Sequence, residues 1–316
     1  MRENEVLAKL SDLFATDDPG VLVGSGPDDC AHLRTDGDRI AVSSDAFTEN
    51  SHFLPDAKPE DVAYKSLAAS VSDLAASACR PRWATVSLCL RKGLSSDWAA
   101  TFSRGLAEAA RRCGVAIVGG DLVASPAATF VSVTVIGEPL PGGPVLRSTG
   151  VPGHVLAVTG NLGGSILGRH LRPEARIGEM KELMRFCAGL GGDAFPSAAM
   201  DISDGLSLDL ARLCRESSVG AEIEEGLIPV SRDAYALSEQ TGRAPLDHAL
   251  SDGEDFELLV ALPERVWERF DAEANGGGGL ACFTRIGRLT VEPGVRLVRV
   301  DGVMYPLAEE GYQHQW

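Results

Sequence analysis

Several motifs that define large enzyme classes are missing from this sequence of 316 residues. It has no G-x-x-x-x-G-K-[ST] phosphate loop, no protein-kinase glycine-rich loop with a catalytic HRD segment, and no H-E-x-x-H zinc motif. The glycine-rich stretch 160–164 lacks the G-x-G-x-x-G spacing of a dinucleotide site. These absences exclude the common P-loop, protein-kinase and zinc-protease classes.

Paired cysteines and long apolar runs are also missing. The seven cysteines form no C-x-x-C pair, and most lie in apolar stretches. This pattern favours buried free thiols in a reducing compartment over a zinc site or a disulfide framework. No apolar run reaches the roughly 18 residues of a membrane span, and the N-terminus lacks a signal-peptide pattern. We therefore expect a cytoplasmic protein without membrane contact.

Basic residues are scarce relative to acidic ones. The chain has 29 Lys and Arg against 45 Asp and Glu, a formal net charge of −16. Such a surface repels nucleic acid and anionic membranes, so no nucleic-acid partner is expected. It would also repel a polyphosphate unless divalent cations stood between the two. Taken by itself, the net charge favours the simpler explanation that it keeps the protein soluble.

The length and the hydrophobic content of 44% suffice for two domains, each with its own core. A stretch rich in proline and glycine at 139–153 predicts a boundary between residues 1–148 and residues 149–316. Strands and helices mix without a regular βαβ period, which predicts an α+β fold. Helices are expected over 4–15, 60–79, 97–113, 174–189, 205–216 and 264–274, and strands over 31–34, 39–43, 83–90, 115–118, 129–137, 154–159, 257–262, 282–286 and 295–300.

Aspartates beside glycine or serine are the most informative pattern. Asp73 lies in the middle of a helix of small residues, where a carboxylate is costly to bury unless it is paired or bound to metal. Three of the clusters also have a structural explanation: a solvated or arginine-paired Asp73, a tight turn at Asp121, and an N-cap at Ser203. Together they supply dispersed oxygen ligands of the kind that several Mg²⁺ ions need. The clusters are Asp28-Asp29, Ser43-Ser44-Asp45, Asp73, Gly119-Gly120-Asp121, Asp201-Ile202-Ser203-Asp204-Gly205 and Asp252-Gly253-Glu254-Asp255.

Six segments make the chain resemble the thiamine-monophosphate kinases, which belong to the superfamily of aminoimidazole ribonucleotide synthetase. The segments occur in the same order and at similar spacing, and the resemblance covers nearly the whole chain. They are SSDAFTENSHF (43–53), DVAYKSLAASVSDLAASACRPRW (61–83), VGGD (118–121), RHLRPEARIGE (169–179), AMDISDGLSLDLARL (199–213) and DGEDFELL (252–259).

The resemblance implies an N-terminal domain of sheet and helices that forms a β-barrel with a second subunit, and an α/β sandwich as the C-terminal domain. It implies a homodimer that uses ATP and several Mg²⁺ ions to phosphorylate thiamine monophosphate. The residues implied to bind metal are Asp29, Ser44, Asp45, Asp73, Asp121, Asp201 and Asp204; Asp45, Asp73, Asp121 and Asp204 are also the implied catalytic residues. Those implied to contact ATP are Gly120, Arg147 and Ser203, and those implied to contact the acceptor are His52, Glu254 and Tyr312.

The sequence departs from the family pattern at three places. Pro27 replaces a glycine before the aspartate pair, residues 122–126 lack a hydroxyl pair and an arginine, and the tail reads EGYQHQW. Two alternatives therefore stay open. One is a related enzyme that phosphorylates or activates another small molecule, and the other is a scaffold that binds nucleotide without turnover.

Overall fold

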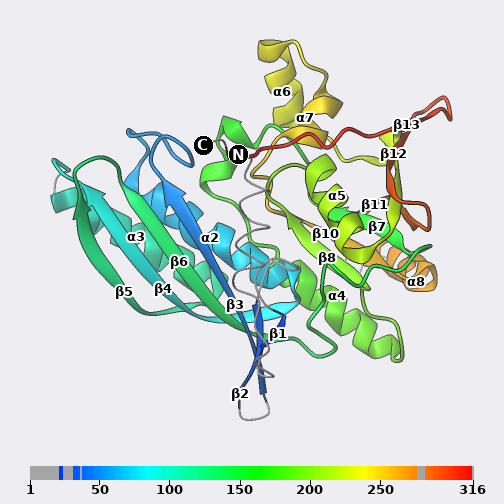
Figure 1. The fold of residues 1–316 in the computed structure, drawn as a ribbon, viewed down its shortest axis with the longest axis horizontal. Coiled ribbons are helices and arrows are strands. Elements are labelled where there is room, and N and C mark those ends of the chain that lie inside the picture. The colour runs from blue at the N-terminus through cyan, green and yellow to red at the C-terminus, as the bar shows by residue number, and fades with distance from the viewer. Residues whose placement is uncertain (1–20, 24–30, 36–37, 95, 276–281, 315–316) are drawn as a thin grey trace.

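The computed structural model describes residues 21–23, 31–35, 38–94, 96–275 and 282–314. They form two β-sheets, each covered by helices, in a two-domain α+β fold (Figure 1). The expected helix over 4–15 lies outside the described residues. Among those described, no helix is both long and apolar enough to cross a bilayer.

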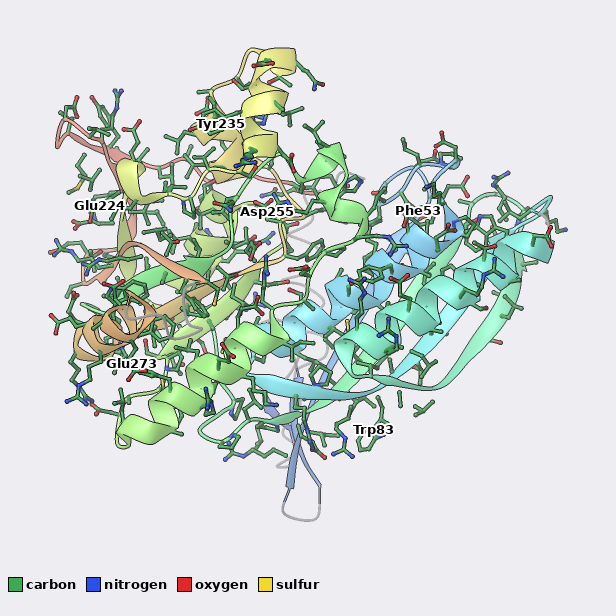
Figure 2. The ribbon with its side chains drawn as sticks, turned by 180° about the vertical axis from the view of Figure 1, so that it is seen from behind. Phe53, Trp83, Glu224, Tyr235, Asp255 and Glu273 are labelled. Atoms are coloured by element: carbon green, nitrogen blue, oxygen red, sulfur yellow. The ribbon has the colours of Figure 1, made fainter. Side chains whose placement is uncertain are left out.

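The first sheet has the strand order β1-β2-β3-β6-β4-β5. Only β4 and β5 run parallel to each other; the other neighbours are antiparallel. Figure 2 shows from the opposite side how α2 (Pro59–Ala76) and α3 (Ser96–Cys113) lie over this sheet. The elements are β1 (Val21–Val23), β2 (Ala31–Thr35), β3 (Asp38–Thr48), α2 (Pro59–Ala76), β4 (Cys79–Arg91), α3 (Ser96–Cys113), β5 (Ala116–Ser125) and β6 (Phe130–Pro139).

The second sheet has the strand order β13-β12-β9-β11-β7-β10-β8. Its central strands β7 and β10 are buried along their whole length, because helices cover both faces. The elements are β7 (Val155–Thr159), η1 (Ser165–Leu167), η2 (Arg169–Leu171), α4 (Ile177–Leu190), β8 (Ala198–Ile202), α5 (Leu206–Ser217), β9 (Gly220–Glu224), η3 (Glu225–Leu227), α6 (Arg232–Thr241), α7 (Pro245–Ser251), β10 (Glu257–Leu262), α8 (Glu264–Asn275), β11 (Phe283–Thr290), β12 (Gly294–Val298) and β13 (Met304–Pro306).

The helix α2 joins the two domains. Its small side chains let it pack closely against β3, β4 and β6, and 14 of its residues are buried. At its C-terminal end, Ala75 and Ala76 enter the same hydrophobic core as Met180 and Leu183 of α4. Because this helix belongs to both cores, it fixes the position of its polar residues relative to the second domain.

Two local predictions from the sequence are wrong. The strand at 115–118 was expected to end before Gly119-Gly120-Asp121, but β5 continues through these residues because β4 pairs with them in parallel. A helix was expected up to residue 79, but β4 already begins at Cys79. The barrel was predicted to form with a second subunit and stays a prediction; within one chain both sheets of the described residues are open, with β1 and β5 at the edges of the first.

Candidate active site

A pocket of about 920 Å³ lies between the two domains. The first domain contributes residues from β3, the turn after it, and α2, and the second contributes the loops after β8 and α7, the helix α6 and the C-terminal tail. Nine of the residues implied to bind metal, ATP or the acceptor line it: Ser44, Asp45, His52, Asp73, Asp201, Ser203, Asp204, Glu254 and Tyr312. The structure therefore brings together carboxylates that are more than a hundred residues apart in the chain.

The strand β3 presents its polar residues to both faces. Residues Ser43 and Asp45 lie on the face covered by α2, and the Ser43 hydroxyl donates a hydrogen bond to Asp73 Oδ2. The Ser44 side chain points to the opposite face and shares a hydrogen bond of 2.9 Å with the Thr134 hydroxyl. Ser43 of β3 therefore binds Asp73 directly, whereas the resemblance implied its neighbour Ser44 as the metal-binding serine.

The loop after β8 carries Ser203 and Asp204. The buried carboxylate of Asp209 accepts the backbone N–H groups of both residues, at 3.0 and 2.9 Å. Arg212 contacts Asp209 and Asp204. The N-cap of α5 is Gly205, so the prediction that Ser203 caps this helix is wrong; the Asp209 carboxylate, one turn into the helix, instead binds the N–H groups of the loop that precedes the helix.

Two further segments pack against this loop through their backbones. The Glu254 N–H donates to Ser203 O at 2.6 Å, and the Tyr312 N–H donates to Asp204 O at 2.9 Å. Glu254 has a φ of 64°, in the left-handed region where residues other than glycine are strained. The pocket's second-domain wall is therefore a set of three loops held together by main-chain hydrogen bonds.

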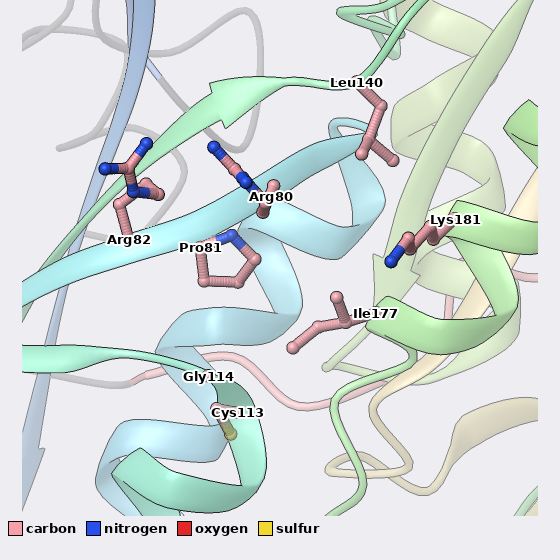
Figure 3. A pocket seen from close by; sticks show the side chains of 8 residues that line it. All are labelled: Arg80, Pro81, Arg82, Cys113, Gly114, Leu140, Ile177 and Lys181. Carbon is pink, nitrogen blue, oxygen red and sulfur yellow. The ribbon is translucent and has the colours of Figure 1, made fainter.

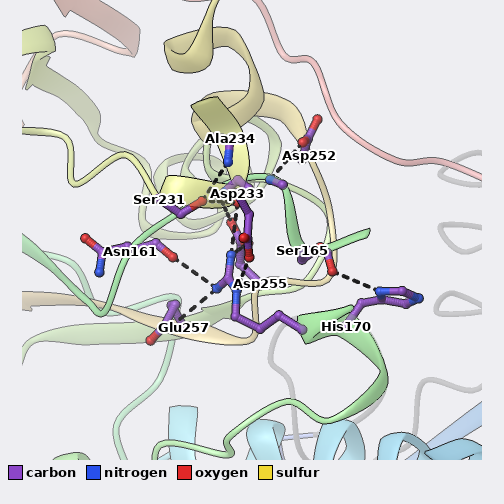
Figure 4. A network of polar contacts seen from close by, with 12 residues as sticks. Asn161, Ser165, His170, Ser231, Asp233, Ala234, Asp252, Asp255 and Glu257 are labelled. Atoms are coloured by element: carbon purple, nitrogen blue, oxygen red, sulfur yellow. Dashed lines mark hydrogen bonds and ion pairs between the residues drawn. The ribbon is translucent and has the colours of Figure 1, made fainter. Parts of the chain in front are cut away.

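A buried ion-pair network supports this wall from behind (Figure 4). Asp255 accepts hydrogen bonds from the Gly163 N–H at 2.8 Å and from Arg169 at 2.9 Å. Burial raises the pKa of the Asp255 carboxyl to about 7, and Arg169 and the Gly163 amide oppose that rise. On the same loop, the Ser165 hydroxyl donates to Gly253 O at 2.7 Å. The network fixes the loop after β7, whose Ser165 and Ile166 line the pocket.

The rings of His52, Tyr312 and His314 form another part of the pocket lining. The ring centroids of His52 and His314 lie 5.3 Å apart, and those of His314 and Tyr312 lie 5.0 Å apart. The Tyr312 and Ser51 hydroxyls share a hydrogen bond of 3.1 Å, which ties the tail to the first domain. Burial lowers the pKa of His52 to about 4, with added repulsion from Lys65 and His314, so this imidazole is neutral at pH 7.

Among the residues that the structure describes, three of the predicted site residues do not line the pocket. Gly120 and Asp121 lie on β5, and β6 and β4 separate that strand from β3. Because β5 is three strand spacings away from β3, the backbone at Asp121 lies about 14 Å from the backbone of the strand that carries Asp45. Arg147 lies in the segment between β6 and β7 and does not line the pocket, and Asp29 lies outside the described residues.

Several residues of the pocket were not assigned a role from the sequence. Arg243 and His248 come from around α7, and both contact Asp252. No motif or spacing in the sequence predicts that these residues lie near the aspartates of the first domain. The only available signal was the acidic cluster at 252–255, which was noted without a role for Asp252.

A second hollow, of about 370 Å³, lies where the start of β4, the end of α3 and the start of α4 meet (Figure 3). Arg80, Arg82 and Lys181 line it. Both arginines already bind the carboxylate of Glu138, at 2.6 and 2.7 Å. Because these arginines have a partner, we assign no chemistry to this hollow.

Comparisons with known proteins agree with this arrangement. Residues 27–138 match the model of the AIR synthase related protein, N-terminal domain, and residues 151–300 match that of the C-terminal domain. Thiamine-monophosphate kinase of Rhodopirellula baltica is 37% identical over 88% of this chain and 86% of its own length. That of Escherichia coli K12 is 33% identical over 99% of this chain and 98% of its own.

Solved structures give the same relationship. The structure of AaThiL complexed with AMPPCP and TMP has a TM-score of 0.83 and 27% identity, and the match covers 99% of this chain and 97% of that one. Thiamine monophosphate kinase from Aquifex aeolicus has a TM-score of 0.77 and 27% identity over 96% of this chain and 99% of that one. The chain therefore belongs to the AIR synthase related family and, within it, to the thiamine-monophosphate kinases.

Proposed function

We propose that this protein transfers the γ-phosphoryl group of ATP to thiamine monophosphate, giving ADP and thiamine diphosphate. The observation that carries the proposal is the convergence of Asp45, Asp73 and Asp204 from both domains on one pocket. The pocket's volume of about 920 Å³ lies in the range of small-molecule sites, up to about 1,000 Å³. The membership in the thiamine-monophosphate kinases supplies the identity of the two substrates.

Magnesium fits the donor set of this pocket. Its carboxylates are oxygen ligands, and four aspartates, Asp45, Asp73, Asp201 and Asp204, line one cavity. Within the described residues, no group of three acidic, histidine or cysteine side chains lies close enough to hold a metal ion by itself. This agrees with ions that take one or two carboxylates each and complete their shells with water and phosphate oxygens. Bound Mg²⁺ would neutralise the charge of the phosphates and of the transferring group.

The acceptor needs little help from a general base. The second pKa of a phosphate monoester is about 6, so the terminal phosphate is mostly a dianion at pH 7. We propose that one of its oxygens forms the new bond to the γ-phosphorus while the bond from that phosphorus to the β,γ-bridging oxygen breaks in line, releasing ADP. No proton has to move, so the role of the protein is to position two anions and to offset their repulsion.

We assign the acceptor to the side of the pocket formed by His52, Glu254 and Tyr312. Arg243 also lines the pocket and can attract a phosphate, while the Glu254 carboxylate favours a cationic ring. The Tyr312 ring is half-exposed and can stack on that ring. The nucleotide contacts of Ser203, Gly120 and Arg147 and the metal contacts of Asp29 and Ser44 stay part of the proposal.

We further propose a homodimer in which a second copy pairs with β5. This strand is exposed along most of its length, with Val118 59%, Leu122 63% and Val123 50% exposed. An edge strand with exposed apolar side chains is a site for pairing with another chain. Such pairing would close the first sheets of the two copies into one barrel. It would also bring Asp121 of one copy toward the pocket of the other copy, whereas within one chain Asp121 does not line the pocket.

One assay separates the proposal from its alternatives. Purified protein is incubated with ATP and Mg²⁺, with and without thiamine monophosphate, and ADP and thiamine diphosphate are followed. Formation of both products only when the acceptor is present supports the proposal. Turnover only with another acceptor identifies a related enzyme, and nucleotide binding without any turnover identifies a scaffold.

A further inference from the structure

Lys65 is the largest fully buried side chain of the first domain's helix α2, with only 1% of its surface exposed. A buried lysine is costly unless its charge is paired and its N–H groups are bound. Its Nζ lies 2.5 Å from Glu254 Oε1 and donates to His52 O at 2.6 Å. The ammonium group therefore contacts one residue from each domain, and both of these residues line the pocket.

Both contacts fall on the acceptor side. Glu254 has the strained left-handed backbone described above, and its N–H binds Ser203 O in the loop that also carries Asp204. His52 lies in the turn after β3 that packs on the tail residue His314. Lys65 is thus linked through one ion pair to the aspartate loop and through one hydrogen bond to the aromatic wall.

We propose that Lys65 is a positioning residue for the acceptor: it fixes the Glu254 carboxylate and the His52 turn across the domain junction. It does not line the pocket and touches no reacting atom. The inference deepens the proposed function, on which it rests, by naming the group that sets the geometry of acceptor binding. It predicts that Lys65 governs the KM of the acceptor and leaves nucleotide binding unchanged.

The Lys65→Met variant keeps an unbranched side chain that is one heavy atom shorter and removes the charge. We expect it to raise the KM for thiamine monophosphate about tenfold or more, with the KM for ATP within about twofold of wild type. Lys181→Met is the matched control, because Lys181 lies on the second hollow and has no contact with the pocket. It should leave both KM values unchanged. Equal changes in both KM values for Lys65→Met would indicate a general loss of structure and would overturn the proposal.

The double variant Lys65→Met/Glu254→Gln tests whether Lys65 acts through Glu254. Removing the carboxylate charge also relieves the unpaired charge that Lys65→Met leaves behind, so the double variant should fold even where the single variant does not. If Lys65 acts through Glu254, the double variant has the acceptor KM of Glu254→Gln alone. An additive increase in KM would contradict the proposal.

A measurement without turnover separates this inference from the proposed function. The charge of Lys65 contributes to the lowered pKa of His52, together with burial and His314. An NMR titration of the His52 ring should show a higher pKa in Lys65→Met than in wild type. If wild type shows no kinase activity but the His52 shift is present, the contact stands and the kinase proposal fails. If wild type is active and neither the shift nor the KM change occurs, the positioning role fails.

Discussion

Ser43 on β3 donates its hydroxyl to the carboxylate of Asp73 on α2, which joins the sheet and the helix at the floor of the pocket. In Asp73→Asn the side chain loses its charge but keeps an oxygen that accepts this hydrogen bond. We expect kcat/KM to fall about 100-fold or more, because a metal-binding carboxylate is lost, while the melting temperature changes little.

Steady-state kinetics with a thermal melt checks this prediction, and Ser43→Ala is its control. That variant removes the hydrogen bond and keeps the carboxylate, so its loss of activity should be much smaller. If Ser43→Ala costs as much as Asp73→Asn, the hydrogen bond matters more than the charge and Asp73 does not act as a metal ligand.

Gly120 has a structural role that can be tested apart from nucleotide binding. Its φ is 153°, and a Cβ added there would lie 1.9 Å from Val86 O on the neighbouring strand. At Gly119 an added Cβ would meet only the Thr85 methyl group, at 3.7 Å. We expect Gly120→Ala to lower the free energy of unfolding by about 2 kcal/mol or more, and Gly119→Ala to change it by less than about 0.5 kcal/mol.

Urea denaturation of the two variants measures the difference. Similar stabilities for both would mean that β5 does not pair with β4 in this register. Normal stability of Gly120→Ala with a higher KM for ATP would instead favour the nucleotide contact predicted from the sequence.

The convergence of the aspartates could be predicted from the sequence, because the segments that carry them have a recognisable order and spacing. Asp73 was identified by its position in a helix of small, buried residues, and the structure places it beside β3. Family membership followed from the same segments, and the α+β class followed from the irregular mix of strands and helices; both are confirmed. The individual roles of the site residues stay predictions.

The features that could not be predicted depend on which strands and which domains lie side by side in the folded chain. Gly119-Gly120-Asp121 resembles a turn when only its neighbours in sequence are considered, but β4 lies alongside and extends the strand through it. That β6 and β4 separate Asp121 from Asp45 is a property of sheet topology. Lys65 was missed for a similar reason, since its partner Glu254 lies on the other domain.

Acid should weaken the fold partly through His52. Burial lowers the pKa of this residue from 6.5 to about 4, so between these values the unfolded chain binds more protons than the native protein. Its contribution to stability is therefore complete above pH 6.5 and is lost as the pH falls toward 4. In His52→Gln the free energy of unfolding should fall less between pH 7 and pH 5 than in wild type. Urea melts at pH 8, 7, 6 and 5 measure this, and parallel curves over the whole range would show that His52 is protonated equally in both states.

Asp45 and Asp121 provide a test of whether two copies share a site. Asp45 lines the pocket, whereas Asp121 lies on the exposed edge strand, about three strand spacings away in the same chain. If both serve one reaction, Asp121 must come from the partner, and Asp45→Asn and Asp121→Asn should each abolish activity. Co-expression of the two variants would then form mixed dimers with one site that contains both aspartates. Random pairing should restore about a quarter of the wild-type activity.

The control for this experiment is co-expression of Asp45→Asn with Asp73→Asn, because both of these residues line the pocket of the same chain. A mixed dimer of that pair has one altered residue in each pocket, so no activity should return. Size-exclusion chromatography with light scattering confirms that every pair dimerises. If Asp45→Asn and Asp121→Asn form mixed dimers that stay inactive, Asp121 does not serve the partner's pocket. If Asp121→Asn alone is fully active, Asp121 takes no part in the reaction, and its position on β5 serves pairing between copies.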